Sequence, residues 1–353
     1  SAYSFYLLGR HCETTGTDTY GDAWGKMIGE RSGVAISALC AAECFVGCVL
    51  YTMIAGDTFR ALLGPVLPAM VSSRPAVISL MGLFILYPLT RLKNLAPLAK
   101  FSSVGTFGII FTVFVMGFRF TQGAYAPGGR FSGIVAASPL QPGAPWLPGI
   151  QALLLASMLS TSYMAHFNAP RLYRELRVPA GAPGSTRLRR FGMVVFTAFS
   201  AVIVLNTLAM CFGFLTFGAA AQGNILDSYA LSDPLAVLSK AAIATSVLFG
   251  HPLQFVGYRD GVGQLLGKNR PGWLSPVLLV ASTAVAICAR DLGVLQALKG
   301  ALVSVFLIFV APSVMAFVSP DPPGGRVGRW GHAALAGVGI LLGTAGVWVS
   351  LRG

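Results

Sequence analysis

Long, uninterrupted apolar runs constrain this chain more than any other feature. Most of them reach the ~20 residues that an α-helix needs to cross ~30 Å of hydrocarbon. Apolar residues are continuous along each run and do not alternate, which favours helices over a β-barrel. We therefore predict nine full transmembrane helices, at about 34–56, 76–90, 99–118, 147–170, 191–217, 234–257, 274–289, 294–318 and 331–350.

The composition points to the same class of protein. Hydrophobic residues make up 55% of the chain and charged residues only 10%, against roughly 25% charged residues in soluble domains. A chain of this composition cannot cover a water-soluble globule with polar groups. The predicted fold is all-α: a polytopic integral membrane protein, with residues 1–353 forming a single transmembrane domain.

The beginning of the chain resembles the end of a helix. It reads "SAYSFYLLGRHCE", has no initial Met and shows no signal-peptide pattern. We expect an N-terminal partial helix here, in a fragment that is N-terminally truncated and lacks at least one upstream helix.

The net charge of +13 is explained by topology. If the loop that follows the first segment is cytoplasmic, the loops on that side carry most of the 25 Lys and Arg residues. This bias follows the positive-inside rule and places the C-terminus on the outer side. It leaves no basic surface that would need a nucleic-acid partner.

Motifs for metal binding and catalysis are absent from the sequence. Cys40, Cys44 and Cys48 share one helix face, but the outer two would be about 12 Å apart, too far for a common zinc ion. We interpret them as small residues that let helices approach closely. The four histidines are scattered and no enzyme motif is present, so we predict a protein that is not an enzyme and has no metal site.

Glu43 is the acidic residue that lies deepest in a predicted span. It follows the start of its helix by nine residues, at about 13 Å depth. An isolated carboxylate at that depth is expected to be neutral or poised to exchange a proton, because burial penalises its charged form. Glu43 could serve proton coupling or bind a substrate amine; alternatively, it is a protonated side chain bonded to a neighbouring helix.

A second polar group interrupts the span at 147–170. Its side chains cover most of the helix circumference, as expected where a broken helix lines a polar cavity. Ordinary helix–helix hydrogen bonding is the alternative. His166, nearer the cytoplasmic end, is more simply a structural histidine. The candidate substrate-binding residues are Ser157, Ser160, Thr161, Ser162 and Tyr163.

A third polar group lies in the span at 234–257. Thr245, Ser246, Gly250, His251 and Pro252 follow one another there. The Gly-x-Pro spacing predicts either a local unwinding or an ordinary proline kink. In the unwound case, the two hydroxyls could help to coordinate Na⁺.

Several short stretches occur in an order that is typical of one transporter family. They include "VLYTMIAGDTF", "HFNAPRLYREL", "FGAAAQGNILDSY", "HPLQFVGYRDGV" and "LKGALVSVFLIFVAPSVMAF". Together they resemble the amino acid/auxin permease family, part of the amino acid–polyamine–organocation superfamily. The resemblance covers nearly the whole chain and implies a LeuT-type inverted-repeat bundle of eleven helices, of which this chain lacks the first.

The resemblance also implies where the substrate and the coupling ion bind. Residues 157–163 fall on the break of the family's sixth helix, and Glu43 falls on the pocket-facing part of its third helix. Sodium-coupled members place a hydroxyl just before the eighth-helix proline, where this chain has Gly250 and His251. Thr245 and Ser246 lie more than a turn away, which favours proton coupling over sodium coupling. The candidate coupling residues are Glu43, Thr245, Ser246 and His251.

We therefore expect a secondary active transporter that moves neutral amino acids by alternating access. Its partners would be the amino acid substrate and the lipid bilayer, without nucleic acid, and it would need no cofactor beyond H⁺ or Na⁺ as coupling ion. It would lie in the plasma membrane or a vacuolar or lysosomal membrane. The alternative is an amino-acid-sensing membrane protein of the same fold without net transport.

Overall fold

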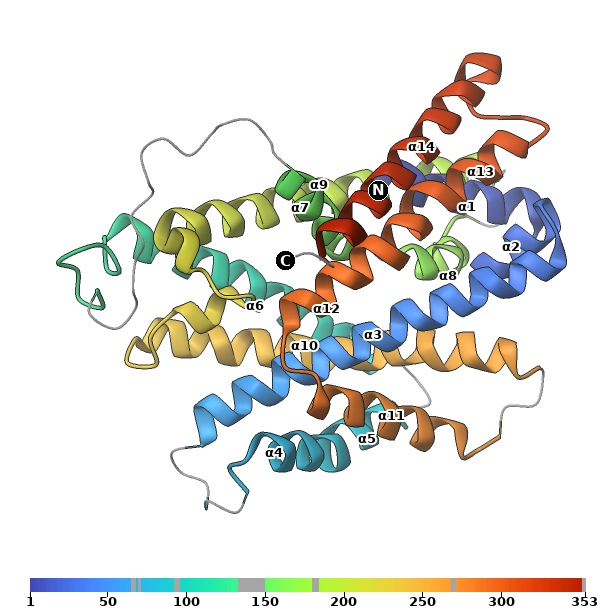
Figure 1. Cartoon of the computed structure of the whole chain (residues 1–353). Coiled ribbons are helices and arrows are strands. Elements are labelled where there is room, and N and C mark those ends of the chain that lie inside the picture. The colour runs from blue at the N-terminus through green and yellow to red at the C-terminus, as the bar shows by residue number, and fades with distance from the viewer. Residues whose placement is uncertain are drawn as a thin grey trace.

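The computed structural model describes residues 1–64, 68, 71–91, 96–132, 150–179, 184–267 and 271–350. Helices connected by loops form all the regular structure of these residues, and no β-strand occurs among them (Figure 1). The all-α prediction is therefore confirmed. The helices, including short 3₁₀ and π segments labelled η, are α1 (Ala2–Thr15), α2 (Tyr20–Met27), α3 (Glu30–Leu63), α4 (Arg74–Met81), η1 (Gly82–Leu86), α5 (Tyr87–Thr90), α6 (Ala96–Thr121), α7 (Ile150–Ser162), η2 (His166–Asn168), α8 (Ala169–Glu175), α9 (Gly184–Phe217), η3 (Gly218–Ala220), η4 (Ile225–Ser228), α10 (Pro234–Leu265), α11 (Leu274–Cys288), α12 (Leu292–Lys299), η5 (Gly300–Ser304), η6 (Phe306–Val310), α13 (Ala311–Val318) and α14 (Gly325–Ser350).

Six helical stretches in the described residues are long and apolar enough to cross a membrane. Two shorter apolar stretches, at 74–90 and 274–288, coincide with the two runs that are shortest in the sequence. α7 has only 13 residues because the helix is interrupted. Each predicted span thus has a helical counterpart, although the full count of nine membrane crossings and the inverted repeat stay predictions. The six long stretches are Glu30–Leu63, Ser103–Thr121, Ser185–Phe217, Pro234–Leu265, Leu292–Val318 and Val327–Trp348.

Burial divides these helices into central and peripheral ones. About 61% of the most apolar window is buried inside the protein in both α3 and the stretch at 292–318, against 6% in α9. Large apolar side chains on α6, such as Phe107 and Phe114, are exposed. Peripheral helices whose exposed surface is apolar are what a lipid solvent requires. α3 and the α12–α13 stretch are therefore the helices on which polar groups are most shielded from lipid.

Small residues allow α3 and α10 to pack closely along their length. A methyl group added at Gly257 would lie 2.7 Å from Cys44 Sγ, and one at Gly261 would lie 2.8 Å from Ala41 Cβ. Cys44 and Cys48 are fully buried, and all six cysteines are free thiols. For Cys44 the interpretation as a small packing residue is confirmed, since close helix approach in membranes depends on small side chains.

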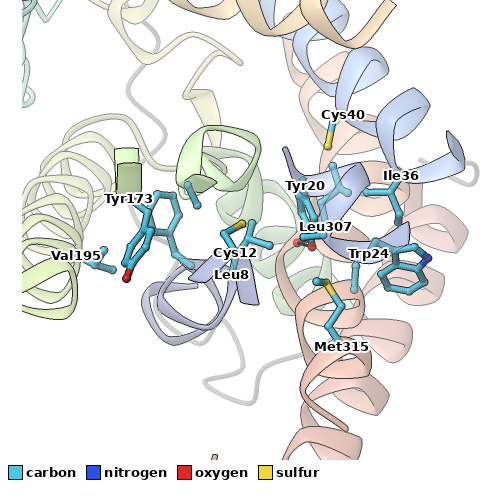
Figure 2. Packing of buried hydrophobic residues seen from close by; sticks show 14 of the residues in the cluster. Leu8, Cys12, Tyr20, Trp24, Ile36, Cys40, Tyr173, Val195, Leu307 and Met315 are labelled. Atoms are coloured by element: carbon cyan, nitrogen blue, oxygen red, sulfur yellow. Dashed lines mark hydrogen bonds between the residues drawn. The ribbon is translucent and has the colours of Figure 1, made fainter. Parts of the chain in front are cut away.

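A second cluster of buried residues ties the first helices to α13 (Figure 2). Leu8 and Cys12 of α1, Tyr20 of α2 and Met315 of α13 belong to it. The Tyr20 hydroxyl donates to the carbonyl oxygen of Leu307 at 2.9 Å, inside the π-helix η6. The wide π turn is thereby held by a side-chain bond as well as by its own backbone.

A buried ion pair connects α6 to the start of α10. The Arg119 guanidinium donates to both carboxylate oxygens of Asp233, at 2.9 and 2.6 Å, and the Tyr125 hydroxyl donates to Oδ2 at 3.0 Å. Asp233 also accepts from the backbone N–H of Leu235 and so caps α10. Its side chain is completely buried. The bidentate geometry satisfies both charges and makes this network a structural one.

Because of this network, we expect the free energy of unfolding to decrease in acid. Burial alone would raise the pKa of Asp233, but the hydrogen bonds from Arg119 and Tyr125 outweigh it and lower the pKa below its ordinary value. A lowered pKa means that the contribution to stability is complete above about pH 4 and is lost as the pH falls through the folded-state pKa. Melting temperatures in detergent should be insensitive to this group from pH 7 to 5 and fall below pH 4. An Asp233→Asn variant with the same acid sensitivity as the wild type would contradict this assignment.

Candidate substrate and coupling site

The helix that carries the predicted substrate residues is broken. α7 ends at Ser162, residues 163–165 leave the helix, and η2 and α8 continue the chain toward Glu175. The last turn tightens, because the backbone N–H of Met164 bonds to the carbonyl of Thr161 at 3.2 Å, and Ala165 then departs from helical geometry with φ −135°. The predicted interruption is confirmed, and its position follows the hydroxyl-rich turn.

The hydroxyls of that turn bond to their own helix. Ser160 Oγ donates to the carbonyl of Ala156 at 2.9 Å, and Thr161 Oγ1 donates to that of Met158 at 2.6 Å. Both side chains are buried, Ser162 is exposed, and the half-buried Tyr163 ring stacks on Phe199 at 6.4 Å. Ser157 lies in α7, but its side chain is outside the described residues. A bonded hydroxyl still offers its oxygen as an acceptor, so a role in substrate binding stays a prediction.

A pocket of about 380 Å³ lies beside the segment that follows the break. Phe167 and Asn168 of η2 line it, together with residues from α8, α10 and the turn before α2. The charge bias assigns these residues to the cytoplasmic side. The volume falls within the range of small-molecule sites. None of the predicted substrate residues lines this pocket, so the structure does not bring them into it.

Charged groups surround the pocket in pairs. Arg174 of α8 forms an ion pair with Asp18, and Arg171 bonds to Glu175 at 2.8 Å. Asp260 of α10 also lines the pocket. In the sequence, Arg171 and Arg174 contribute to the charge bias between the two sides of the membrane. Arg171 and Arg174 lie six and nine residues after Ala165, on the helix that follows the break, and this position was the signal that could have identified them.

Glu43 is fully buried and is not isolated. Lys299 Nζ, at the end of α12, lies 2.6 Å from Glu43 Oε1, and Ser304 Oγ of η5 donates to Oε2 at 2.9 Å. The bond from Ser304 agrees with the alternative of a side chain bonded to a neighbouring helix, and α12 also brings a cation to Glu43, which neither alternative included. The sequence held a signal for this pair: Lys299 falls inside a predicted span, and charges inside a membrane pair with one another.

The third polar group lies on a continuous helix. α10 runs without interruption from Pro234 to Leu265, with Pro252 inside it, so the local unwinding that would suit Na⁺ is not observed. Thr245 Oγ1 donates to the carbonyl of Ala241 at 2.8 Å. The Oγ of Ser246 lies 2.7 Å from the point where a methyl group on Gly105 of α6 would stand. No hydrogen bond or ion pair in the described part of the chain joins these side chains to Glu43.

Of the four buried histidines, His251 and His166 lie in the predicted polar segments, and their surroundings differ. His251 is buried, stacks on Phe255 at 6.1 Å, and has no hydrogen-bond partner for either ring nitrogen within the described residues. His166 lies 3.0 Å from Ser4 Oγ through Nε2 and packs edge-on against Phe5. His166 is thus a structural histidine, as expected. A coupling role for His251 stays a prediction. In the residues that the structure describes, no group of three or more metal-binding side chains comes together.

Comparison with known proteins decides the family. The sequence profile described as "Transmembrane amino acid transporter protein" matches residues 1–351. The chain belongs to this transmembrane amino acid transporter family. It is accordingly a multi-pass membrane protein from a family of transporters, and the family resemblance seen in the sequence motifs is confirmed.

Individual relatives are identical to this chain at about a quarter of the aligned positions. A Danio rerio protein named "Putative sodium-coupled neutral amino acid transporter 11" is 26% identical over 324 residues, which is 88% of this chain and 68% of that protein. The Homo sapiens protein of that name is 26% identical over 322 residues, 88% of this chain and 74% of the relative. "Vacuolar amino acid transporter 5" of Schizosaccharomyces pombe is 26% identical over 296 residues, 79% and 64% of the two chains. This chain spans about two thirds of the length of the curated relatives it matches.

Proposed function

We propose that the protein is a secondary active transporter that moves neutral amino acids across a membrane by alternating access. The observation that carries this proposal is the pocket beside the break between α7 and η2. A broken helix exposes backbone polar groups at membrane depth, and such breaks accompany substrate sites in transporters. The relatives' names, which include neutral amino acid transporters, support the substrate class.

The pocket would serve as the inner end of the substrate path. It offers guanidinium and carboxylate groups, Arg174 and Asp18 among them, near backbone that has left the helix. An amino acid zwitterion carries one group of each sign, so both of its charges have partners of opposite sign here. Weak, multiple contacts at such a site suit release, since tight binding at the exit would slow transport.

We propose proton coupling through Glu43. In its support, the polar groups on α10 are poorly arranged for sodium: the helix is continuous through Pro252, and the Thr245 hydroxyl is already a donor within it. Na⁺ needs several oxygen ligands that point to one place. Glu43, by contrast, is a buried carboxylate on the central helix α3. The names of several relatives include sodium coupling, so the coupling ion is the part of the proposal that most needs a direct test.

Uptake measurements with the full-length protein in proteoliposomes test the proposal. Labelled neutral amino acid should exchange in counterflow and accumulate in sodium-free buffer when the outside is acidic, and a protonophore should abolish the accumulation. One proton per substrate and a gradient of one pH unit support up to about tenfold accumulation. Binding without counterflow would instead identify an amino acid sensor. Strict dependence on Na⁺ would refute proton coupling while leaving transport intact.

The membrane in which the protein lies is a separate question. The relatives include a protein named as a vacuolar transporter, and we propose a plasma or a vacuolar or lysosomal membrane for this protein. Both have a proton gradient directed toward the cytoplasm, as proton-coupled uptake requires. Fluorescence microscopy of the tagged full-length protein distinguishes the two locations.

A further inference from the structure

The family assignment does not explain why the buried carboxylate of Glu43 on α3 is paired with a lysine, Lys299 of α12. Lys299 is 9% exposed and Glu43 is not exposed at all, and the two side chains meet at 2.6 Å. Replacing such a pair by apolar residues is often neutral or stabilising, so packing alone does not require these charges. A pair kept at this depth is a candidate for function.

We propose that Lys299 is a positioning residue for coupling: its ammonium holds Glu43 ionised, and protonation of Glu43 releases α12 and η5 from α3. This inference rests on the proposed transport function. The Glu43 carboxylate takes up one proton and becomes a carboxyl group, Lys299 keeps its ammonium, and the net charge of the pair rises from zero to +1. Loss of the proton on the other side of the membrane restores the pair.

The backbone around Lys299 fits a movable element. Lys299 is the last residue of α12, and two π-helical segments, η5 and η6, follow it almost directly. Segments with π geometry are rare and are frequently found at functional sites. The Ser304 hydroxyl bonds to Glu43 and also lies 3.4 Å from the carbonyl oxygen of Lys299. Protonation of the Glu43 carboxylate therefore alters a hydrogen bond to a side chain of η5.

The position of η5 connects the pair to the broken helix. η5 and α12 pack against α3 on one side and against α7 on another. α7 is the helix that ends at the break after Ser162. When the ion pair between Glu43 and Lys299 is lost, η5 keeps its more extensive packing against α7 and α14. The pair can thus bias the position of the element that borders the broken helix.

Three thiols of α3 lie near the pair. Cys40 and Cys44 of α3 are in electrostatic range of Glu43, and Cys44 and Cys48 are in range of Lys299. Thiols are neutral near pH 7, so they contribute no competing charge.

Two single substitutions test the role of Lys299. K299M leaves the carboxylate without a cation, and burial then favours its neutral form at every accessible pH. Initial uptake by this variant should no longer depend on external pH, while counterflow persists within about threefold of wild type, a change of under one kcal/mol. K299R, which keeps the positive charge, should retain the pH dependence. If K299M keeps the wild-type pH profile and only its melting temperature falls, the role of Lys299 is structural. That result would overturn the inference.

Ser304→Ala keeps the test decisive if K299M is not recovered from membranes. This variant removes one hydrogen bond to the ionised carboxylate and leaves the ion pair in place. The midpoint of the uptake profile should move to higher pH by about one unit, because the charged form loses stabilisation. An unchanged midpoint overturns the inference but not the proposed function. Absence of counterflow in the wild type overturns both, so the two failures are distinguishable.

Discussion

Replacing Glu43 by glutamine should abolish pH-driven accumulation of substrate and spare exchange. Glutamine has nearly the shape of a protonated glutamate but cannot release a proton, so it mimics one state of the cycle permanently. Glu43 is completely buried and bonded to Lys299 and Ser304. In proteoliposomes with an inward proton gradient of one unit, accumulation should fall from up to about tenfold to none.

Glu30→Gln is the matched control for this experiment. Glu30 begins the same helix α3 but is exposed, so the identical substitution there should leave accumulation unchanged. Counterflow must be measured for both variants, because a general loss of folding lowers exchange as well. Full proton-driven accumulation in the Glu43→Gln variant would remove this carboxylate from the mechanism and leave the family assignment untouched.

Breaking the ion pair between Arg119 and Asp233 should cause a large loss of stability. Asp233→Asn leaves the Arg119 guanidinium, whose side chain is 11% exposed, without its carboxylate. Removing one partner of a buried pair costs about 3–5 kcal/mol. It also weakens the cap of α10 and the bond that Tyr125 donates. The measurement is the thermal unfolding of the purified protein in detergent at pH 7.

An exposed arginine supplies the comparison for this network. Arg290 lies in the turn after α11 and is exposed, so Arg290→Gln should change the free energy of unfolding by under about 0.5 kcal/mol. An Arg119→Leu/Asp233→Asn double variant should recover part of the loss, because it leaves no unpaired charge. If the Asp233→Asn variant has the same melting temperature as the wild type, the network does not stabilise the fold. Any acid sensitivity must then arise from other groups.

Much of the site could be located from local sequence, but its partners could not. The polar turn at 157–163 stands out against the apolar run "IQALLLA", and the structure breaks the helix at its end. Whether a Gly-x-Pro stretch kinks or unwinds was undecidable from the sequence. In α10 the surrounding helices α3 and α6 pack against it on both sides, and it remains one helix.

The amino acid sequence by itself determined that lipid is the solvent, which segments are helical, and which polar residues lie at membrane depth. These properties depend on composition and on neighbours within a few turns, and both can be read along the chain. Only the tertiary structure decided that Glu43 meets Lys299 and Ser304, the latter 261 positions away. The pocket beside η2 was likewise invisible. Such contacts depend on the rotation and register of packed helices, which hydrophobic patterning leaves open when apolar residues surround a helix on every side.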